Sequence, residues 1–159
     1  MFNKLRRRKR VMSNTHEEYV SEEIAKLMKE AGFDWECHSC YQNSVFYEFT
    51  ISHQTRDVLI MNFNDAPVYM NQQSAPSLHV AQEWLRTLNY HVDAFADCDS
   101  NGVFFHARWM HLQKPERFAY LTEEDDRYYK SYKTHKEALE AVILFVLKQY
   151  IKERDEKKD

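Results

Sequence analysis

Glycine is nearly absent from this chain of 159 residues, which contains only Gly32 and Gly102. Because glycine tolerates a left-handed backbone better than any other residue, we expect both positions to mark chain reversals. The scarcity also excludes classes of site, since a Walker loop or a dinucleotide-binding turn needs several closely spaced glycines. An HExxH helix, a nucleophile elbow and an EF-hand loop are missing as well. We therefore do not expect an enzyme.

Gly32 ends the first predicted helix. An apolar stripe at the helical period precedes it, formed by Val20, Ile24, Leu27, Met28 and Ala31. Ser21 is the expected N-cap, and a capping box from Thr15 to Glu18 is an alternative one turn earlier. Phe33 follows the glycine as the apolar residue of a Schellman-type helix end.

Gly102 predicts a hairpin. Asn101 precedes it, and an Asn-Gly pair is preferred at the centre of a type I′ turn between two alternating runs. With this pair at the centre, Ser100 would face Val103, and Cys98 would lie on the core face of the sheet.

The other face of this hairpin carries two polar contacts in the same register. Asp97 would pair with His106 as a charge pair, and Phe95 with Arg108 as a cation–π contact. A carboxylate beside an imidazole can orient a catalytic base. Since no serine, cysteine or lysine clearly converges there, we interpret the pair as a cross-strand contact on a solvated face.

The remaining segments complete the fold prediction. Residues 45–51 and 58–63 have the pattern of a hairpin with the polar link 53–57. A helix-start signal at residues 74–76 predicts a second helix. Its expected buried face is Leu78, Ala81, Trp84, Leu85 and Leu88. Residues 117–121 form an optional further strand.

A capping box from Thr134 to Glu137 opens a long, mostly apolar last helix. The order α-β-β-α-β-β-(β)-α predicts a single α+β domain with a mostly antiparallel sheet and about three helices. We place this domain at residues 15–152, between a flexible arm at 1–14 and a charged, frayed tail at 153–159.

The arm holds six of the 22 basic residues, among them Arg6, Arg7 and Arg8, whereas the acidic total is 25, so residues 11–159 carry a net charge of −9. Met12 is an alternative translation start, and if translation begins there, residues 1–11 are not part of the native protein. The longest apolar run, residues 141–147, is too short to span a bilayer, and the arm lacks the features of a secretory signal. We expect a cytoplasmic protein without membrane contact.

Cys37, His38 and Cys40 form the candidate metal motif, a CxxC with an adjacent imidazole. A structural zinc site needs a second ligand pair at short spacing, and none follows. We expect unligated thiols and no cofactor, with zinc binding and a redox dithiol as the alternatives.

A second candidate site consists of Lys130, Lys133, His135 and Lys136, which precede and open the last helix. Together with Arg6, Arg7 and Arg8 they would serve nucleic-acid binding, and the element order from residue 76 onward parallels that of double-stranded RNA-binding domains. The acidic balance of the domain opposes phosphate binding.

Aromatic residues favour a protein partner instead. An aromatic binding surface could be built from Trp35, Tyr41, Tyr128, Tyr129 and Tyr132. We therefore predict a small interaction protein with an unidentified protein partner, and nucleic-acid binding is the alternative.

Three segments carry a family resemblance: SEEIAKLMKEAGFDWECHSCY (21–41), SAPSLHVAQEWLRTLNYHVDAF (74–95) and YKTHKEALEAVILFVLKQYI (132–151). They are similar to a family of small uncharacterised proteins of Bacteroides-type bacteria, their prophages and mobile elements. The resemblance implies a phage or mobile-element accessory protein, and it implies no catalytic residue.

Overall fold

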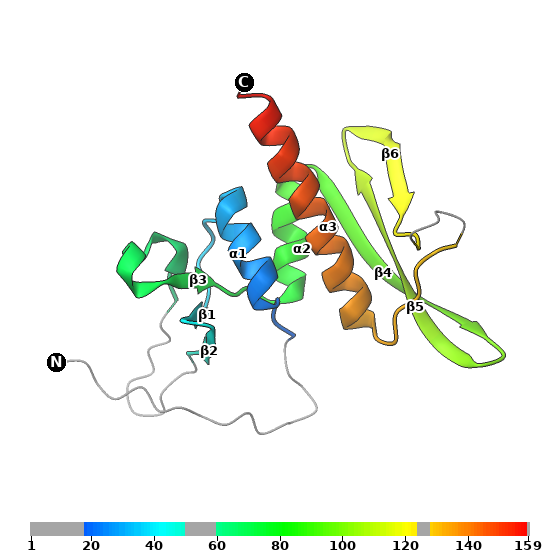
Figure 1. Ribbon diagram of the computed structural model, residues 1–159, viewed down its shortest axis with the longest axis horizontal. Helices are drawn as coiled ribbons and strands as arrows, with labels where there is room; N and C mark the ends of the chain where they lie inside the picture. Colours follow the sequence, from blue (N-terminus) through cyan, green and yellow to red (C-terminus); the bar gives the residue numbers. More distant parts are fainter. Residues whose placement is uncertain (1–17, 50–59, 124–127, 159) are drawn as a thin grey trace.

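Three α-helices lie between two separate antiparallel sheets in the computed structural model, which describes residues 18–49, 60–123 and 128–158 (Figure 1). The helices are α1 (Glu22–Ala31), α2 (Leu78–Thr87) and α3 (His135–Glu156). The predicted class, a single α+β domain with antiparallel pairing, is confirmed.

The first sheet has the order β2-β1-β3, with β1 (Ser39–Gln42), β2 (Val45–Glu48) and β3 (Gln72–Ser74). The second has the order β4-β5-β6, with β4 (Tyr90–Asp99), β5 (Gly102–His111) and β6 (Lys114–Tyr120). Two single-turn 3-10 helices, η1 (Phe63–Asp65) and η2 (Val68–Met70), precede β3.

The end of α1 follows the prediction. Gly32 has a φ of 95°, and its N–H bonds to the Lys29 and Met28 carbonyls. The Phe33 N–H donates to the Met28 carbonyl at 2.9 Å, which completes a Schellman-type end. Ser21 is the N-cap residue, although its side chain makes no capping bond. Thr15, part of the alternative capping box, lies outside the described residues.

The other two helices begin where the sequence predicts, but α3 ends later than predicted. Ser77 caps α2 by accepting from the Val80 N–H, so this helix begins directly after residues 74–76, which predict it. The capping box of Thr134 and Glu137 opens α3 as predicted. At its other end α3 continues to Glu156, so the predicted frayed tail is wrong over residues 153–156. Arg117 of β6 forms an ion pair with Glu153, which helps to hold this last turn.

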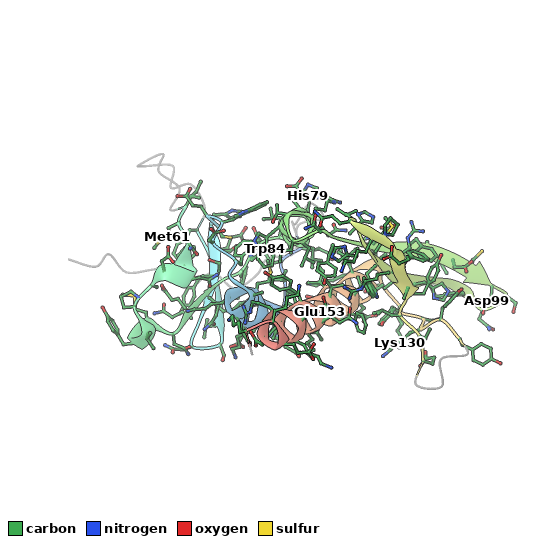
Figure 2. All side chains as sticks on the ribbon, turned by 90° about the horizontal axis from the view of Figure 1, so that it is seen from above. Met61, His79, Trp84, Asp99, Lys130 and Glu153 are labelled. Atoms are coloured by element: carbon green, nitrogen blue, oxygen red, sulfur yellow. The ribbon has the colours of Figure 1, made fainter. Side chains whose placement is uncertain are left out.

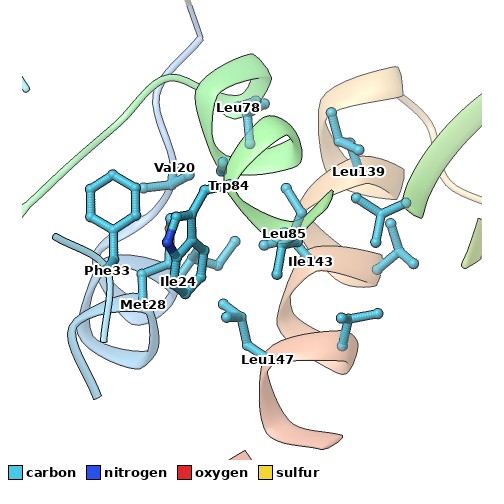
Figure 3. Packing of buried hydrophobic residues seen from close by; sticks show 14 of the residues in the cluster. Val20, Ile24, Met28, Phe33, Leu78, Trp84, Leu85, Leu139, Ile143 and Leu147 are labelled. Atoms are coloured by element: carbon cyan, nitrogen blue, oxygen red, sulfur yellow. The ribbon is translucent and has the colours of Figure 1, made fainter. Parts of the chain in front are cut away.

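The hydrophobic core lies where the three helices meet (Figure 3). It joins apolar side chains from α1, α2 and α3, among them Ile24, Met28, Trp84, Leu85, Ile143 and Leu147. The central helix α3 contacts α1 on one side and β4 and β5 on the other. Of the predicted apolar face of α2, Leu78, Ala81, Trp84 and Leu85 are buried, and Leu88, which follows the last helical residue, is partly buried against the same core.

The predicted pairing of residues 45–51 with 58–63 is not found in the parts of these segments that the structure describes, residues 45–49 and 60–63. β2 pairs instead with β1, through a turn at Asn43 and Ser44 whose φ values are 49° and 63°. Positive φ at both central residues defines a type I′ turn, here built without glycine. Met61 forms a bridge with Cys37, and the predicted link 53–57 lies outside the described residues.

The β4-β5 hairpin is present, but its register is shifted by two residues from the prediction. Asp99 pairs with Gly102, which places Ser100 and Asn101 in the turn. Asp99 accepts a hydrogen bond from the Asn101 N–H at 2.7 Å, and this local contact fixes the turn one residue earlier. A two-residue shift keeps every side chain on its predicted face.

Cys98 lies on the core face of the hairpin as predicted, but its side chain is exposed. Here β4 and β5 extend past the N-terminal end of α3 and leave the helix layer behind (Figure 1). The side chains near the tip of the hairpin therefore have no helix to pack against.

Within the described residues, none of the helices combines the length and the apolar character that crossing a membrane requires.

Glu140 of α3 is half-buried near the start of α1. Burial raises the pKa of Glu140, although Lys136 and a hydrogen bond with the Ser21 backbone act in the opposite direction. Its Oε1 atom is buried without a hydrogen-bond partner among the described residues. The ionised side chain is therefore poorly accommodated at neutral pH.

We expect Glu140→Gln to raise the melting temperature at pH 7, because the amide carries no charge to desolvate. A raised folded-state pKa means that stability is fully present below the unfolded value near 4.5 and is lost as pH rises through the folded pKa. The gain should therefore shrink at pH 4. Thermal unfolding followed by circular dichroism at both pH values tests this, with the exposed Glu36→Gln as control. An equal gain at both pH values would contradict the assignment.

Candidate functional site

The outer face of the β4-β5-β6 sheet carries aromatic side chains. All three helices lie on the other side of this sheet (Figure 1), where Trp109 of β5 packs against Phe145 of α3. An antiparallel sheet covered on one side is expected to be polar on its solvated side. Here six rings occupy that side, and we call them the aromatic face: Phe95, Phe104, His106, Phe118, Tyr120 and Tyr129.

The rings of the aromatic face form one connected network. Tyr129 stacks on Tyr120 with ring centroids 4.4 Å apart. Tyr120 also meets Phe118 at 5.3 Å and Phe95 at 5.8 Å, in both cases edge to face. His106 lies at the centre, 5.1 Å from Phe104 and 5.8 Å from Phe95. Such ring pairs hold one another in a fixed arrangement.

Exposure differs across the aromatic face. His106 is buried at 7% exposure, whereas Phe118 and Tyr129 are 44% and 53% exposed. The centre is thus a packed floor, and the rim presents apolar rings to solvent. Large exposed rings on a rigid support are typical of interaction surfaces.

His106 ties the segment before α3 to the sheet. Its Nδ1 lies 2.9 Å from the Lys130 carbonyl oxygen, which can only accept, so Nδ1–H is the donor. Its Nε2 lies 3.7 Å from an Asp97 carboxylate oxygen, diagonally across the hairpin. The predicted contact of Asp97 with His106 is therefore present. The bond from the imidazole to Lys130 also holds the neighbouring Tyr129 beside the sheet.

Arg108 adds a cation to the aromatic face but is neutralised there. Its guanidinium donates to Asp93 at 3.0 Å and lies 5.3 Å from the centre of the Phe95 ring. The hydrogen bond with Asp93 raises the pKa of Arg108 further above its ordinary value. The predicted cation–π contact is confirmed as a diagonal one, and the cation has a carboxylate partner already.

The predicted basic cluster lies beside the aromatic face. Lys130 and Lys133 are exposed in the segment before α3, and His135 and Lys136 begin the helix. The Lys130 ammonium lies 5.7 Å from the centre of the Tyr132 ring. The other half of the predicted nucleic-acid site, Arg6, Arg7 and Arg8, lies outside the described residues.

The predicted aromatic surface is divided by the fold. Tyr129 belongs to the aromatic face, and Tyr128 beside it is exposed. Tyr132 pairs through its backbone with Phe105 at the sheet edge. Trp35 and Tyr41 instead pack against the core near α1, where the Tyr41 hydroxyl donates to the Val20 carbonyl at 3.1 Å.

The CxxC motif is part of the core. Cys37 and Cys40 are both buried, and Cys40 lies in β1. Burial raises the pKa of Cys37 to about 11 and that of Cys40 to about 12. Zinc binds the thiolate, so these surroundings disfavour it. His38 contacts the Tyr19 hydroxyl at 2.7 Å, and the described residues contain no group of three or more metal-ligating side chains.

We expect a thiol reagent to titrate about one thiol per native chain at pH 7, although the sequence contains three cysteines. Cys98 is exposed, whereas the other two are buried and protonated. Cys98→Ser should abolish the rapid reaction, and denaturant should release all remaining thiols. Rapid labelling of Cys37 or Cys40 in the folded protein would contradict the burial described above.

A second group of exposed apolar side chains lies at the opposite end of the molecule. Val68 and Tyr69 of η2 are 94% and 83% exposed. This projection is remote from the aromatic face (Figure 1) and supplies matched control positions for it.

Comparison with protein-family models, curated proteins and solved structures finds no match for this chain. The family resemblance of the three sequence segments therefore stays a prediction.

Proposed function

We propose that the protein is a non-catalytic binding module that docks the aromatic face of its second sheet on a protein partner. One observation carries the proposal: a sheet face expected to be polar holds a connected set of aromatic rings with an exposed rim. Tyrosine and phenylalanine are enriched in protein interfaces because they bury much area at little conformational cost. The sequence resemblance supports an accessory role in a phage or mobile element.

Charge favours a protein over a nucleic acid as the partner. The arginine of the aromatic face is paired with Asp93, and residues 11–159 carry a net charge of −9. Binding to a phosphate backbone gains most of its free energy from cations that are free to neutralise phosphates. The face therefore offers stacking surface without the positive field that a nucleic acid needs.

The test compares two double variants as bait in lysate of the encoding organism. Phe118→Ser with Tyr129→Ser removes the exposed rings of the face, and Val68→Ser with Tyr69→Ser removes two exposed apolar side chains elsewhere. We expect proteins retained by the wild type to be retained by the second variant and lost with the first. Unchanged retention by the Phe118 and Tyr129 variant would overturn the proposal. Circular dichroism confirms that both variants fold.

Nucleic-acid binding is the second candidate, favoured by one observation. The Lys130 ammonium over the Tyr132 ring, close to Tyr129, resembles the cation and stacking surface used for single strands. A gel shift with single- and double-stranded DNA and RNA at low salt separates the candidates. We expect no retardation, whereas salt-sensitive binding that Lys130→Ala weakens would favour the second candidate.

A further inference from the structure

β4 is an edge strand along its whole length. The order of the second sheet is β4-β5-β6, so among the described strands β4 has a hydrogen-bonded neighbour on one side only. No described strand or isolated bridge pairs with its other side. The backbone groups on that side either find another partner or remain available.

The register shows which residues point to the free side. Phe105 exchanges both backbone hydrogen bonds with Tyr132, and the Ala107 carbonyl accepts from Leu121. These β5 residues therefore bond away from β4, and their neighbour His106 bonds toward it, opposite Phe95. Since bonding direction alternates along a strand, the even-numbered residues of β4 face the free side.

Two contacts confirm this direction and limit the open part of the edge. The Gln82 side chain of α2 donates to the Val92 carbonyl at 3.1 Å, so α2 covers the beginning of the edge. The Cys98 N–H is taken by the neighbouring Asp97 carboxylate at 2.8 Å. Ala94 is buried and Ala96 is exposed. Within the described part of the chain, the N–H and C=O of Ala96 and the C=O of Cys98 therefore remain for a partner.

This open edge belongs to the part of the hairpin that leaves the helix layer. Asp99 marks its tip, far from Trp84 in the core (Figure 2). Val103, opposite Cys98, is 67% exposed. A two-stranded ribbon is marginally stable alone, so a ribbon that extends beyond its core gains from an added strand.

The side chains along the edge specify the chemistry of that strand. On the core side, Ala96 and Cys98 are small and leave room for larger apolar side chains alongside. On the outer side, Asp97 and Asp99 alternate with them and share the face of Phe95. Among the described residues, neither carboxylate has an ion pair with lysine or arginine; Asp97 meets His106, and Asp99 accepts from the Asn101 backbone. Cations on alternate residues of a neighbouring strand would complement this pattern.

Resting on the proposed function, we propose that the partner contributes an extended segment with alternating basic and apolar residues, which adds to β4 as a further antiparallel strand. Its apolar side chains would lie beside Ala96 and Cys98, and its basic ones beside Asp97 and Asp99. A second copy of β4 is disfavoured in this place, because antiparallel self-pairing through Ala96 would set aspartates against aspartates or against Phe95.

The probe is a labelled seven-residue peptide that alternates lysine and valine, titrated into the full chain and followed by fluorescence polarisation. Ala96→Pro removes the outward N–H without removing a bond to β5, and Ala96→Ser keeps that N–H as the matched control. We expect the proline variant to bind roughly tenfold more weakly and the serine variant to bind like the wild type. Asp97→Asn with Asp99→Asn should weaken binding and reduce its dependence on salt.

Two N-methylated peptides make the test independent of how Ala96→Pro folds. Methylating the valine nitrogens or the lysine nitrogens leaves the charge unchanged, but only one set of N–H groups can face the edge. In antiparallel addition the valines lie opposite Ala96, so valine methylation should abolish binding and lysine methylation should not. Equal binding of both peptides, or no binding of the parent peptide, would overturn the edge proposal. If partner capture still depended on Phe118 and Tyr129, the proposed function would stand without it.

Discussion

Ile143→Ala should lower the free energy of unfolding by about 2–5 kcal/mol, as large-to-small substitutions in packed cores do. Ile143 is fully buried at the middle of α3 and belongs to the cluster that joins the three helices (Figure 3). Because α3 contacts both α1 and the second sheet, the cavity would weaken packing on both sides of the helix layer.

Urea denaturation followed by circular dichroism measures this change. Lys152→Ala is the matched control on the same helix, at an exposed position, and should change stability little. A loss at Ile143 no larger than at Lys152 would contradict the central place of α3 in the core.

Ser74→Ala should cost about 1–3 kcal/mol, because a buried donor loses its acceptor. The fully buried Ser74 hydroxyl accepts from the Phe63 N–H at 3.0 Å. It also lies 3.4 Å from the Asn62 side-chain oxygen, so it links β3 to the start of η1. The measurement is again urea denaturation, with the exposed Ser100→Ala as control. An unchanged stability would mean that the Phe63 N–H finds another acceptor.

The helices were the predictable part of the fold because their signals are local. Gly32 with Phe33 and the box of Thr134 and Glu137 each act within one turn of the chain, so no tertiary information is needed. The same local logic did not extend to β1, whose turn uses Asn43 and Ser44 where glycine would have been the stronger signal.

Strand pairing was harder to predict because alternative turns differ little in free energy. With the hydrogen bond from the Asn101 N–H to Asp99 in place, the register of the β4-β5 hairpin differs by two residues from the predicted one. Both predicted cross-strand contacts persisted as diagonal ones, since an even shift preserves the faces. A shift by one residue would have exchanged them.

The sequence did not predict that most rings of the aromatic face gather on one face of the sheet. Of its members, only Tyr129 stood among the residues proposed for an aromatic surface, although Phe95 and His106 had been placed on the outer side of the hairpin. Phe118 and Tyr129 are brought together by β6 and by the return of the chain before α3. Rings gathered from three strands and a loop show no periodicity that a linear pattern could reveal.

The separation of the two sheets has a consequence for local unfolding. The first sheet meets the helix layer chiefly through α1 and β3, whereas the second is held by α2 and α3 (Figure 1). Segments with separate contacts can open separately, at a lower free energy than global unfolding. Amide hydrogen exchange should therefore divide the chain into a faster unit at β1, β2 and β3 and a slower unit around α3, so that one end of the molecule can loosen while the other keeps its shape.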